Sequence, residues 1–279
     1  MPSPVDLRSI DVSQFKHWRS PCGTVLLVNA DCLSVLQVLP AGCVDLLLTY
    51  PQYGISQPGV SHEGPPGKGS RSFDFFKHDS PEEASNLAMA AWRESRRLMT
   101  SSASAYWWVG HYTFGPLVAA YHGDGWKTRF LVWSKACPAP APPGSGWPSA
   151  AELCVYAFRS GRTWTHDGTN APRSNVITCD SYRHGIPGKV NHPTQKPFGV
   201  MVPIVEASSR IGELVLDPFI GSGTTAVCAI RTKRQCIGCE IDTEHGYFDI
   251  AVNRCRAELA RQPLFKERKP REIQGSFLT

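Results

Sequence analysis

Two short segments of the sequence have residue types that could bind a ligand or act on one, and the first is a glycine-rich turn. Residues 217–226 read DPFIGSGTTA and follow the segment ELVL at 213–216, whose last three residues are apolar. Gly221 and Gly223 let a ligand approach the backbone closely at the N-terminus of the helix that should follow. Since no Lys follows the second glycine, the turn is not a phosphate-binding P-loop.

Two nucleotide cofactors suit this turn. Gly221, Gly223 and Ala226 fit the GxGxxA pattern of dinucleotide-binding enzymes. Glu240 lies about 20 residues further on, at the end of the next expected strand, where a carboxylate can accept hydrogen bonds from both hydroxyls of a ribose. Because a nicotinamide dinucleotide and an adenosyl cofactor both carry that ribose, the turn alone is compatible with either.

The second segment, TYPQYG at 49–54, joins an apolar strand to a loop with an aromatic ring at either end. Residues 44–48 lack polar alternation, which is typical of a strand covered on both faces. Pro51 cannot donate to a strand ladder and should end the strand. Open α/β sheets bind ligands outside the carboxyl ends of their strands, so Tyr50 and Tyr53 are well placed for chemistry.

A third segment, residues 159–190, mixes basic and aromatic residues in a polar stretch without regular periodicity. Such a mixture suits contacts to phosphates and unstacked bases, although a solvated surface loop would have the same composition. The candidate DNA-binding residues are Arg159, Arg162, Arg173, Arg183 and Lys189, with Trp164 and Tyr182 as the accompanying aromatics.

Strands that alternate with helices must position these segments, and the alternation indicates a mostly parallel sheet. The longest expected helix starts at Ser80, which can cap it, and has acidic residues in its first turn and basic residues near its end. Strands are expected near 24–29, 44–49, 104–110, 128–135, 152–158, 213–217 and 235–242, with helices after residue 31, near 80–99, 113–122 and 198–209, up to 231, and near 246–261.

The composition fits one soluble globular domain. The 279 residues carry a net charge of +5, with 42% hydrophobic and 19% charged residues, and this mild basic excess is compatible with nucleic-acid binding. The N-terminal residues lack the pattern of a signal peptide, and no apolar run reaches the ~20 residues that span a bilayer. We therefore expect a cytoplasmic protein with no membrane partner.

The ten cysteines are spread along a chain with sizeable apolar segments, so most should be reduced thiols in the core. Cys236 and Cys239 form a CxxC inside an expected strand, which raises a zinc or redox interpretation. No second CxxC or His pair completes a tetrahedral site, and we therefore expect no metal.

Three motifs together resemble one enzyme family. They are NADCLSVLQVLPAGCVDLLLTYPQYG at 29–54, HPTQKP at 192–197 and LDPFIGSGTT at 216–225. They are similar to the catalytic and cofactor motifs of the β-class S-adenosylmethionine-dependent DNA methyltransferases, which act on adenine N6 or cytosine N4. The catalytic block comes first and the cofactor block last, as in a permuted subgroup of that family.

The resemblance implies a doubly wound, mostly parallel, Rossmann-like α/β sheet that is circularly permuted and carries a small irregular target-recognition insertion. It implies one methyltransferase domain over residues 1–279, with a catalytic block at 24–135, the insertion and loops at 136–190 and a cofactor-binding block at 191–258. The implied partners are double-stranded DNA, which would associate the protein with the nucleoid, and a second copy of the chain in a homodimer.

The resemblance also implies how S-adenosylmethionine is held. The glycine turn should hold its methionine half, Glu240 its ribose and Asp31 its adenine amino group, although a helix cap is the alternative role for Asp31. The implied cofactor-binding residues are Asp31, Cys32, His192, Thr194, Gln195, Lys196, Asp217, Phe219, Gly221, Ser222, Gly223, Thr224, Thr225 and Glu240.

The catalytic segment departs from the family pattern, in which Asp, Asn or Ser is followed by Pro-Pro-Tyr. Tyr50 replaces the first residue and Gln52 the second proline, while Pro51 and Tyr53 match. By resemblance, Tyr53 stacks on a flipped base whose amino group donates to Tyr50, to Gln52 or to the Pro51 carbonyl. Adenine is the favoured target because it prevails in the family. Cytosine N4, an inactive DNA-binding relative and a nicotinamide-dependent oxidoreductase are the alternatives.

Overall fold

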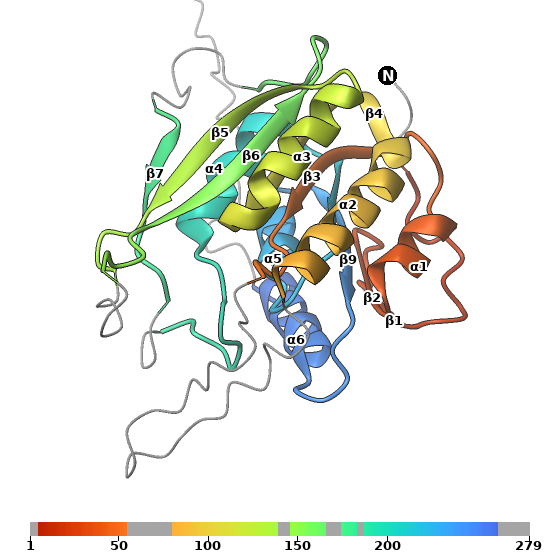
Figure 1. Ribbon diagram of the computed structural model, residues 1–279. Coiled ribbons are helices and arrows are strands. Elements are labelled where there is room, and N and C mark those ends of the chain that lie inside the picture. The colour runs from red at the N-terminus through yellow and green to blue at the C-terminus, as the bar shows by residue number, and fades with distance from the viewer. Residues whose placement is uncertain (1–4, 55–79, 139–145, 166–173, 183–186, 262–279) are drawn as a thin grey trace, which may run out of the picture.

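The computed structural model describes residues 5–54, 80–138, 146–165, 174–182 and 187–261. They form a nine-stranded mixed sheet with the strand order β1-β2-β9-β8-β3-β4-β6-β5-β7 (Figure 1). The strands are β1 (Lys16–Arg19), β2 (Val25–Asn29), β3 (Val44–Thr49), β4 (Met99–Val109), β5 (Lys127–Ser134), β6 (Ala151–Phe158), β7 (Val176–Thr178), β8 (Leu214–Asp217) and β9 (Gln235–Glu240). The helices are α1 (Cys32–Val38), α2 (Pro81–Leu98), α3 (His111–Gly123), α4 (Phe198–Ser208), α5 (Thr224–Arg231) and α6 (Tyr247–Leu259).

The centre of the sheet is parallel and consists of β2, β9, β8, β3 and β4. β6 runs antiparallel between β4 and β5, and β1 runs antiparallel to β2. The chain crosses from β8 through α5 to β9 in one direction, and from β3 through α2 to β4 in the other. The strand order therefore reverses between β8 and β3, and open α/β sheets bind ligands in the crevice at such a point.

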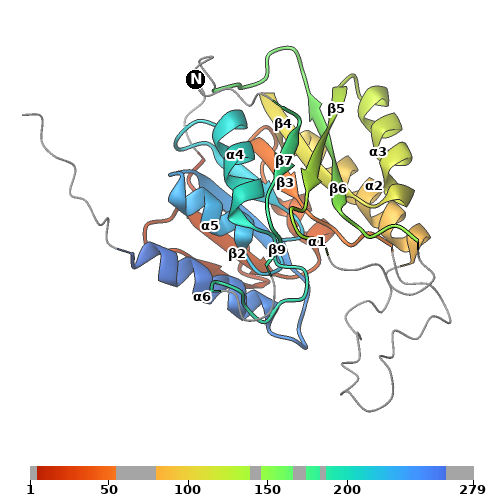
Figure 2. The same cartoon turned by 90° about the vertical axis from the view of Figure 1, so that its left-hand side faces the viewer.

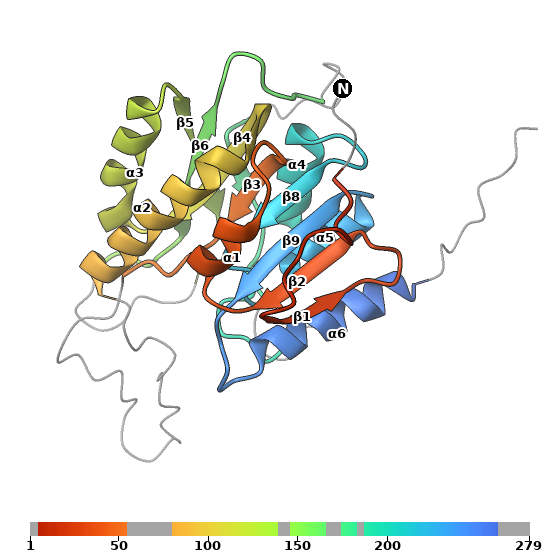
Figure 3. The same ribbon diagram turned by 90° about the vertical axis from the view of Figure 1, so that its right-hand side faces the viewer.

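Helices cover both faces of the sheet (Figures 2 and 3). Leu36 of α1, Trp92 of α2 and Tyr121 of α3 are buried in one hydrophobic cluster, and Val205 of α4 and Phe248 of α6 in another. The expected doubly wound α/β fold is confirmed. In chain order β3 and β4 precede β8 and β9, as the permuted arrangement requires.

The sequence around α2 explains how this helix begins and ends. Ser80 and Glu83 form a capping box in which Ser80 Oγ accepts from the Glu83 backbone N–H at 3.2 Å, and Pro81 takes the first helical position. Arg96 and Arg97 lie in the last turn, near the negative end of the helix dipole. α2 thus delivers the chain to β4, whose carboxyl end lies beside that of β3.

The strand expected at 152–158 is present as β6, and it belongs to the main sheet although it falls within residues 136–190, where the insertion and loops are expected. Two strands were not predicted. β1 has the polar sequence KHWR, which lacks the apolar pattern of the inner strands, and β7 has only three residues in an otherwise polar segment. Among the described residues, no helix combines the length and the apolarity needed to cross a membrane.

Candidate active site

A cleft with a volume of about 1130 Å³ opens at the carboxyl ends of the parallel strands. Asp217 ends β8 and Glu240 ends β9, while Tyr50 follows β3 and Gly110 follows β4, and all four line the cleft. Binding sites for one small molecule usually span about 300–1,000 Å³. This cleft is therefore large enough for a cofactor and part of a second substrate.

The buried carboxylate of Asp217, at the end of β8, connects this strand to β3, and the strand order reverses between these two strands. Its oxygens accept hydrogen bonds from Thr49 Oγ1 at 2.7 Å, from Thr225 Oγ1 at 2.6 Å and from the Phe219 backbone N–H at 3.1 Å. Burial raises the pKa of Asp217 to about 6, although these hydrogen bonds oppose the shift. Asp217 thereby fixes the end of β3 to the start of α5.

The glycine turn is held against α6. A Cβ added at Gly223, whose φ is +80°, would lie 2.8 Å from Ala251 Cβ, so no larger residue fits there. Arg254 of α6 donates to Ser222 Oγ at 3.0 Å and to Thr224 Oγ1 at 3.1 Å. Ser222 and Thr224 line the cleft, whereas Gly223 serves the packing of the turn on α6.

Two further carboxylates face the cleft from the ends of β2 and β9. Glu240 Oε1 accepts from the Asp242 backbone N–H at 2.8 Å, and burial raises the pKa of Glu240. Asp31 Oδ2 accepts from the Ser34 backbone N–H at 3.1 Å and caps α1, so the structure shows the alternative role for this residue. Cys32, next to Asp31, is buried and also lines the cleft, as does the half-buried Phe219.

The HPTQKP segment contributes residues of three kinds. His192 and Thr194 line the cleft. Gln195 instead accepts from the Val190 backbone N–H at 2.7 Å and donates to the Gly188 oxygen at 2.9 Å, which fixes the preceding loop. Lys196 lines the cleft on the side of the TYPQYG loop.

His192 should make the stability of the protein depend on pH. Burial, together with the charges of Lys189 and Lys196, lowers the pKa of His192 from 6.5 to about 3. The unfolded chain therefore binds the extra proton between these two values, and the free energy of unfolding should fall as the pH drops from 6.5 toward 3. His192→Gln should remove this part of the pH dependence. Urea unfolding of both proteins at about pH 5 and about pH 7.5 tests this, and equal pH dependences would contradict it.

The TYPQYG loop brings its aromatic rings together. The Tyr50 ring stacks on Trp108 with a centroid distance of 4.9 Å, and Lys196 Nζ lies 3.8 Å from the Tyr50 centroid. The Tyr50 hydroxyl is buried and has no hydrogen-bond partner among the described residues. Burial raises the pKa of Tyr50 well above its usual value, so its phenol is neutral. Tyr53 is half-buried and Gln52 is exposed, and both line the cleft.

Glu152, the second residue of β6, is a residue of this site that the sequence analysis missed. The Tyr53 hydroxyl donates to Glu152 Oε2 at 2.9 Å, Lys196 Nζ lies 3.1 Å from the same oxygen, and Lys135 Nζ lies 3.0 Å from Oε1. Its position in the sequence carried one signal, a single acidic residue at the start of an otherwise apolar strand.

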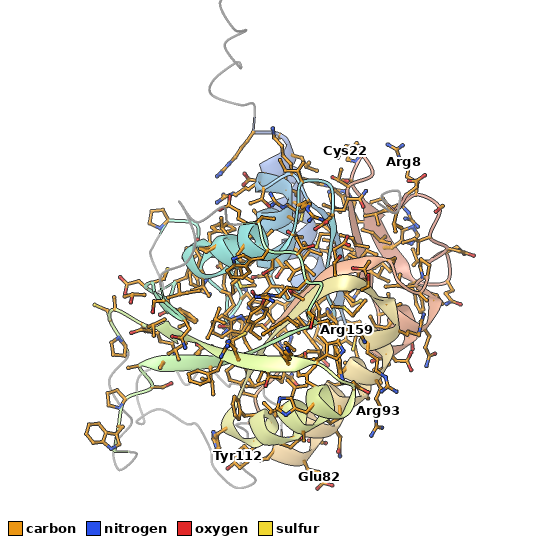
Figure 4. All side chains as sticks on the ribbon, turned by 90° about the horizontal axis from the view of Figure 1, so that it is seen from above. Arg8, Cys22, Glu82, Arg93, Tyr112 and Arg159 are labelled. Atoms are coloured by element: carbon orange, nitrogen blue, oxygen red, sulfur yellow. The ribbon has the colours of Figure 1, made fainter. Side chains whose placement is uncertain are left out.

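Arg159 and Arg162 follow β6 at the end of the strands that lies opposite the cleft. Because β6 runs antiparallel to β4, its first residues, Glu152 among them, lie at the cleft. Phe158 follows Glu152 by six residues, and with a rise of ~3.3 Å per residue it lies about 20 Å away. Arg159, labelled in Figure 4, lies over the Trp126 ring, and Arg162 over the Phe158 ring. The structure therefore does not bring these two arginines to the cleft.

The other candidate DNA-binding residues have different outcomes. Arg173 and Arg183 lie outside the described residues. The Lys189 ammonium donates to the backbone oxygen of His192, which places Lys189 beside the cleft.

The CxxC pair lies inside β9. All ten cysteines have free thiols and most are buried. A spacing of three in a strand puts Cys236 and Cys239 on opposite faces of the sheet, in different hydrophobic clusters, so they cannot ligate one ion together. Within the described ranges, no group of three or more His, Cys, Asp or Glu side chains could hold a metal.

Known proteins are similar to this chain in both sequence and fold. The N6_N4_Mtase family model, described as DNA methylase, matches residues 44–253. The chain is 27% identical over 244 residues to the Type II methyltransferase M2.DpnII of Streptococcus pneumoniae, across 84% of this chain and 90% of that protein. It is 29% identical over 245 residues to the Type II methyltransferase M2.LlaDCHI of Lactococcus lactis subsp. cremoris, across 82% and 88%.

Solved structures show the same fold. The cytosine-N4-specific PvuII DNA methyltransferase gives a TM-score of 0.65 at 15% identity, over 83% of this chain and 86% of that one. The M1.HpyAVI–SAM complex gives a TM-score of 0.58 at 20% identity, over 82% and 99%.

The family match spans the strand before TYPQYG, the HPTQKP segment and the glycine turn. It therefore decides between the two cofactors that suit the turn, in favour of S-adenosylmethionine. The chain belongs to the N6/N4 DNA methylase family and is an S-adenosylmethionine-dependent DNA methyltransferase.

Proposed function

We propose that the protein methylates the exocyclic amino group of a flipped base in double-stranded DNA, with adenine N6 as the target. One observation above all supports this activity: the cofactor motifs and the TYPQYG loop, far apart in sequence, line a single cleft. Adenine is favoured by the resemblance to the family, and cytosine N4 is the alternative that the family allows.

The residues on the β8–β9 side of the cleft fit S-adenosylmethionine. Glu240 offers a carboxylate to which two ribose hydroxyls can donate. The cap hydrogen bonds of Asp31 use Oδ2, so Oδ1 can accept from the adenine amino group. Gly221 lines the cleft, and a Cβ there would lie only 3.0 Å from His192 Nε2, so the bare glycine lets the turn proposed to hold the methionine half pack closely against His192. When bound, the cofactor supplies an electrophilic methyl group.

The residues on the TYPQYG side suit an amino group as the methyl acceptor. An exocyclic amine is a poor nucleophile because its lone pair is delocalised into the ring, so groups that accept from its N–H bonds raise its reactivity. The neutral Tyr50 hydroxyl, the Pro51 carbonyl and the Gln52 amide are the acceptors of this loop. Tyr53 offers a ring on which an unstacked base can pack, which offsets the cost of removing it from the duplex.

We assign contacts with the DNA phosphates to basic residues of the segment 159–190. Lys189 lies beside the cleft, and Arg173 and Arg183 belong to the same basic segment. Residues 1–279 act as one domain in this proposal, and a homodimer would place two such segments on one duplex.

Transfer of tritium from labelled S-adenosylmethionine to mixed duplex DNA tests the function. We expect the label in DNA, and nucleoside analysis should find it in N6-methyldeoxyadenosine. Label in N4-methyldeoxycytidine would instead select cytosine. Binding of cofactor and DNA without any transfer would contradict the proposed activity and favour a DNA-binding relative that has lost catalysis.

A further inference from the structure

An acidic side chain, Glu152, touches the TYPQYG loop and has no part in the function proposed above. It lines the cleft from the start of β6, and its side chain is only 12% exposed. Its carboxylate contacts the Tyr53 hydroxyl and the ammonium groups of Lys196 and Lys135. A buried acid that reaches into a substrate cleft needs such partners, and here they come from three separate segments of the chain.

These contacts keep Glu152 ionised and leave it one acceptor position. Burial opposes ionisation, but the charges of Lys196 and Lys135 outweigh it and lower the pKa of Glu152. An ionised carboxylate has about four lone-pair positions. Tyr53 and Lys196 use two on Oε2 and Lys135 uses one on Oε1, so Oε1 can accept one further hydrogen bond.

Glu152 is also a stronger acceptor than the tyrosine at the start of the loop. Lys196 Nζ lies 3.1 Å from Glu152 Oε2 and 3.8 Å from the centre of the Tyr50 ring, so the carboxylate and this ring share one neighbour. The Tyr50 phenol is neutral, and hydrogen bonds to an ionised acceptor are roughly twice as strong as those between neutral groups.

We propose that Glu152 Oε1 accepts a hydrogen bond from the exocyclic amino group of the target base, an inference that rests on the proposed methyl transfer. The hydrogen bond draws on the N–H bond and frees the nitrogen lone pair. As the nitrogen bonds to the methyl carbon, the methyl–sulfur bond breaks and its electron pair stays on sulfur. The nitrogen passes one proton to Oε1, from which it leaves to water. Glu152 is then a catalytic residue, and Lys135 and Lys196 hold it in place.

Glu152→Gln tests this role, because it keeps the shape of the side chain and removes the anionic acceptor. The single-turnover rate of methyl transfer should fall ~10²-fold or more, the usual loss of one oriented polar group in a dry site. Cofactor affinity should stay close to that of the unsubstituted protein, whereas the midpoint of thermal unfolding should fall, because Lys135 and Lys196 lose their buried counter-charge. An unchanged rate would overturn the inference. If the unsubstituted protein itself transfers no methyl group, the proposed function fails, and the inference with it.

Further variants separate an acceptor from a structural role. Glu152→Gln leaves the two lysines without a counter-charge, and adding Lys135→Gln removes that excess without restoring the acceptor. The rate should therefore stay low, and recovery would assign Glu152 to charge balance and overturn the inference. Tyr53→Phe loses its bond to Glu152 and should slow transfer far less than Glu152→Gln, whereas an equal loss would show that Glu152 only orients Tyr53.

A shorter acid covers the case in which Glu152→Gln does not fold. Glu152→Asp retains the charge between Lys135 and Lys196 but draws the carboxylate back by one methylene. Transfer should slow at least ~10-fold, since displacement of a reacting group by about 1 Å is costly. A folded Glu152→Asp protein with full activity would overturn the inference.

Discussion

Glu240→Ala should bind S-adenosylmethionine at least about 100-fold more weakly than the unsubstituted protein. Each hydrogen bond to a charged acceptor contributes ~1.5–3 kcal/mol, and ~1.4 kcal/mol corresponds to a tenfold change in Kd, so the loss of two ribose contacts reaches this factor. The carboxylate lies at the end of β9 in the cleft, where the ribose is proposed to bind. Isothermal titration calorimetry measures the change directly.

The controls separate this contact from damage to the fold. Glu240 also accepts from the Asp242 backbone N–H, and Glu240→Gln keeps one oxygen that can accept this hydrogen bond. The thermal midpoint of Glu240→Gln should therefore be close to that of the unsubstituted protein, while its affinity for S-adenosylmethionine should still be low. Glu82→Gln changes an exposed acid of α2 that points away from the molecule in Figure 4 and should leave affinity unchanged. Full affinity in Glu240→Ala would move the ribose to another part of the cleft.

Local sequence preferences predicted most of the elements that position the cofactor side. Gly221 and Gly223 mark a turn that needs positive φ, and the structure gives them φ values of +49° and +80°. The strand before this turn and the strand ending at Glu240 are short apolar runs, typical of a parallel sheet. Ser80, Glu83 and the basic last turn also predicted α2, because a cap or a charge near a helix end stabilises backbone groups only a few residues away.

Contacts between distant segments could not be predicted in this way. The ion pairs of Glu152 with Lys135 and Lys196 depend on β6 running antiparallel beside β5, which no local pattern encodes. The same strand direction places Arg159 at the end of the strands that lies opposite the cleft. Gln195 belongs to a recognisable motif, yet its amide is used by the backbone of residues 188 and 190.

The departure of the TYPQYG loop from the family pattern is easier to understand in this structure. Tyr50 packs against Trp108 and Lys196, so its ring serves the apolar wall of the cleft. The anionic group of this region comes from β6 instead, as Glu152, and is held by lysines from two further segments. A substitution at one position of a catalytic loop therefore has to be judged with the side chains that reach the same cleft from other strands.

Gly110→Ala should reduce methyl transfer ~10²-fold or more while cofactor affinity stays unchanged. Gly110 follows β4 and caps α3 with a φ of −77°, a value that alanine adopts freely, so backbone strain has no part in the effect. The added Cβ would lie 2.6 Å from the Tyr53 backbone oxygen and 3.0 Å from Tyr53 Cβ. Relief of that overlap must shift the TYPQYG loop, and a displacement of about 1 Å in a reacting geometry costs ~10²-fold in rate.

Gly115→Ala is the matched control for this substitution. Gly115 lies in α3, and a Cβ there would meet nothing within 4 Å among the described residues outside its own stretch of helix, so the variant should keep full activity. Pro116 follows directly and disfavours the helical conformation of a preceding residue that carries a Cβ, so no gain in stability is expected. Single-turnover rates and S-adenosylmethionine titrations of both variants separate the two halves of the cleft. If Gly110→Ala kept its transfer rate, the position of Tyr53 would not limit the reaction. If it lost cofactor affinity as strongly as rate, the TYPQYG loop would belong to the cofactor site, and the division of the cleft proposed here would be wrong.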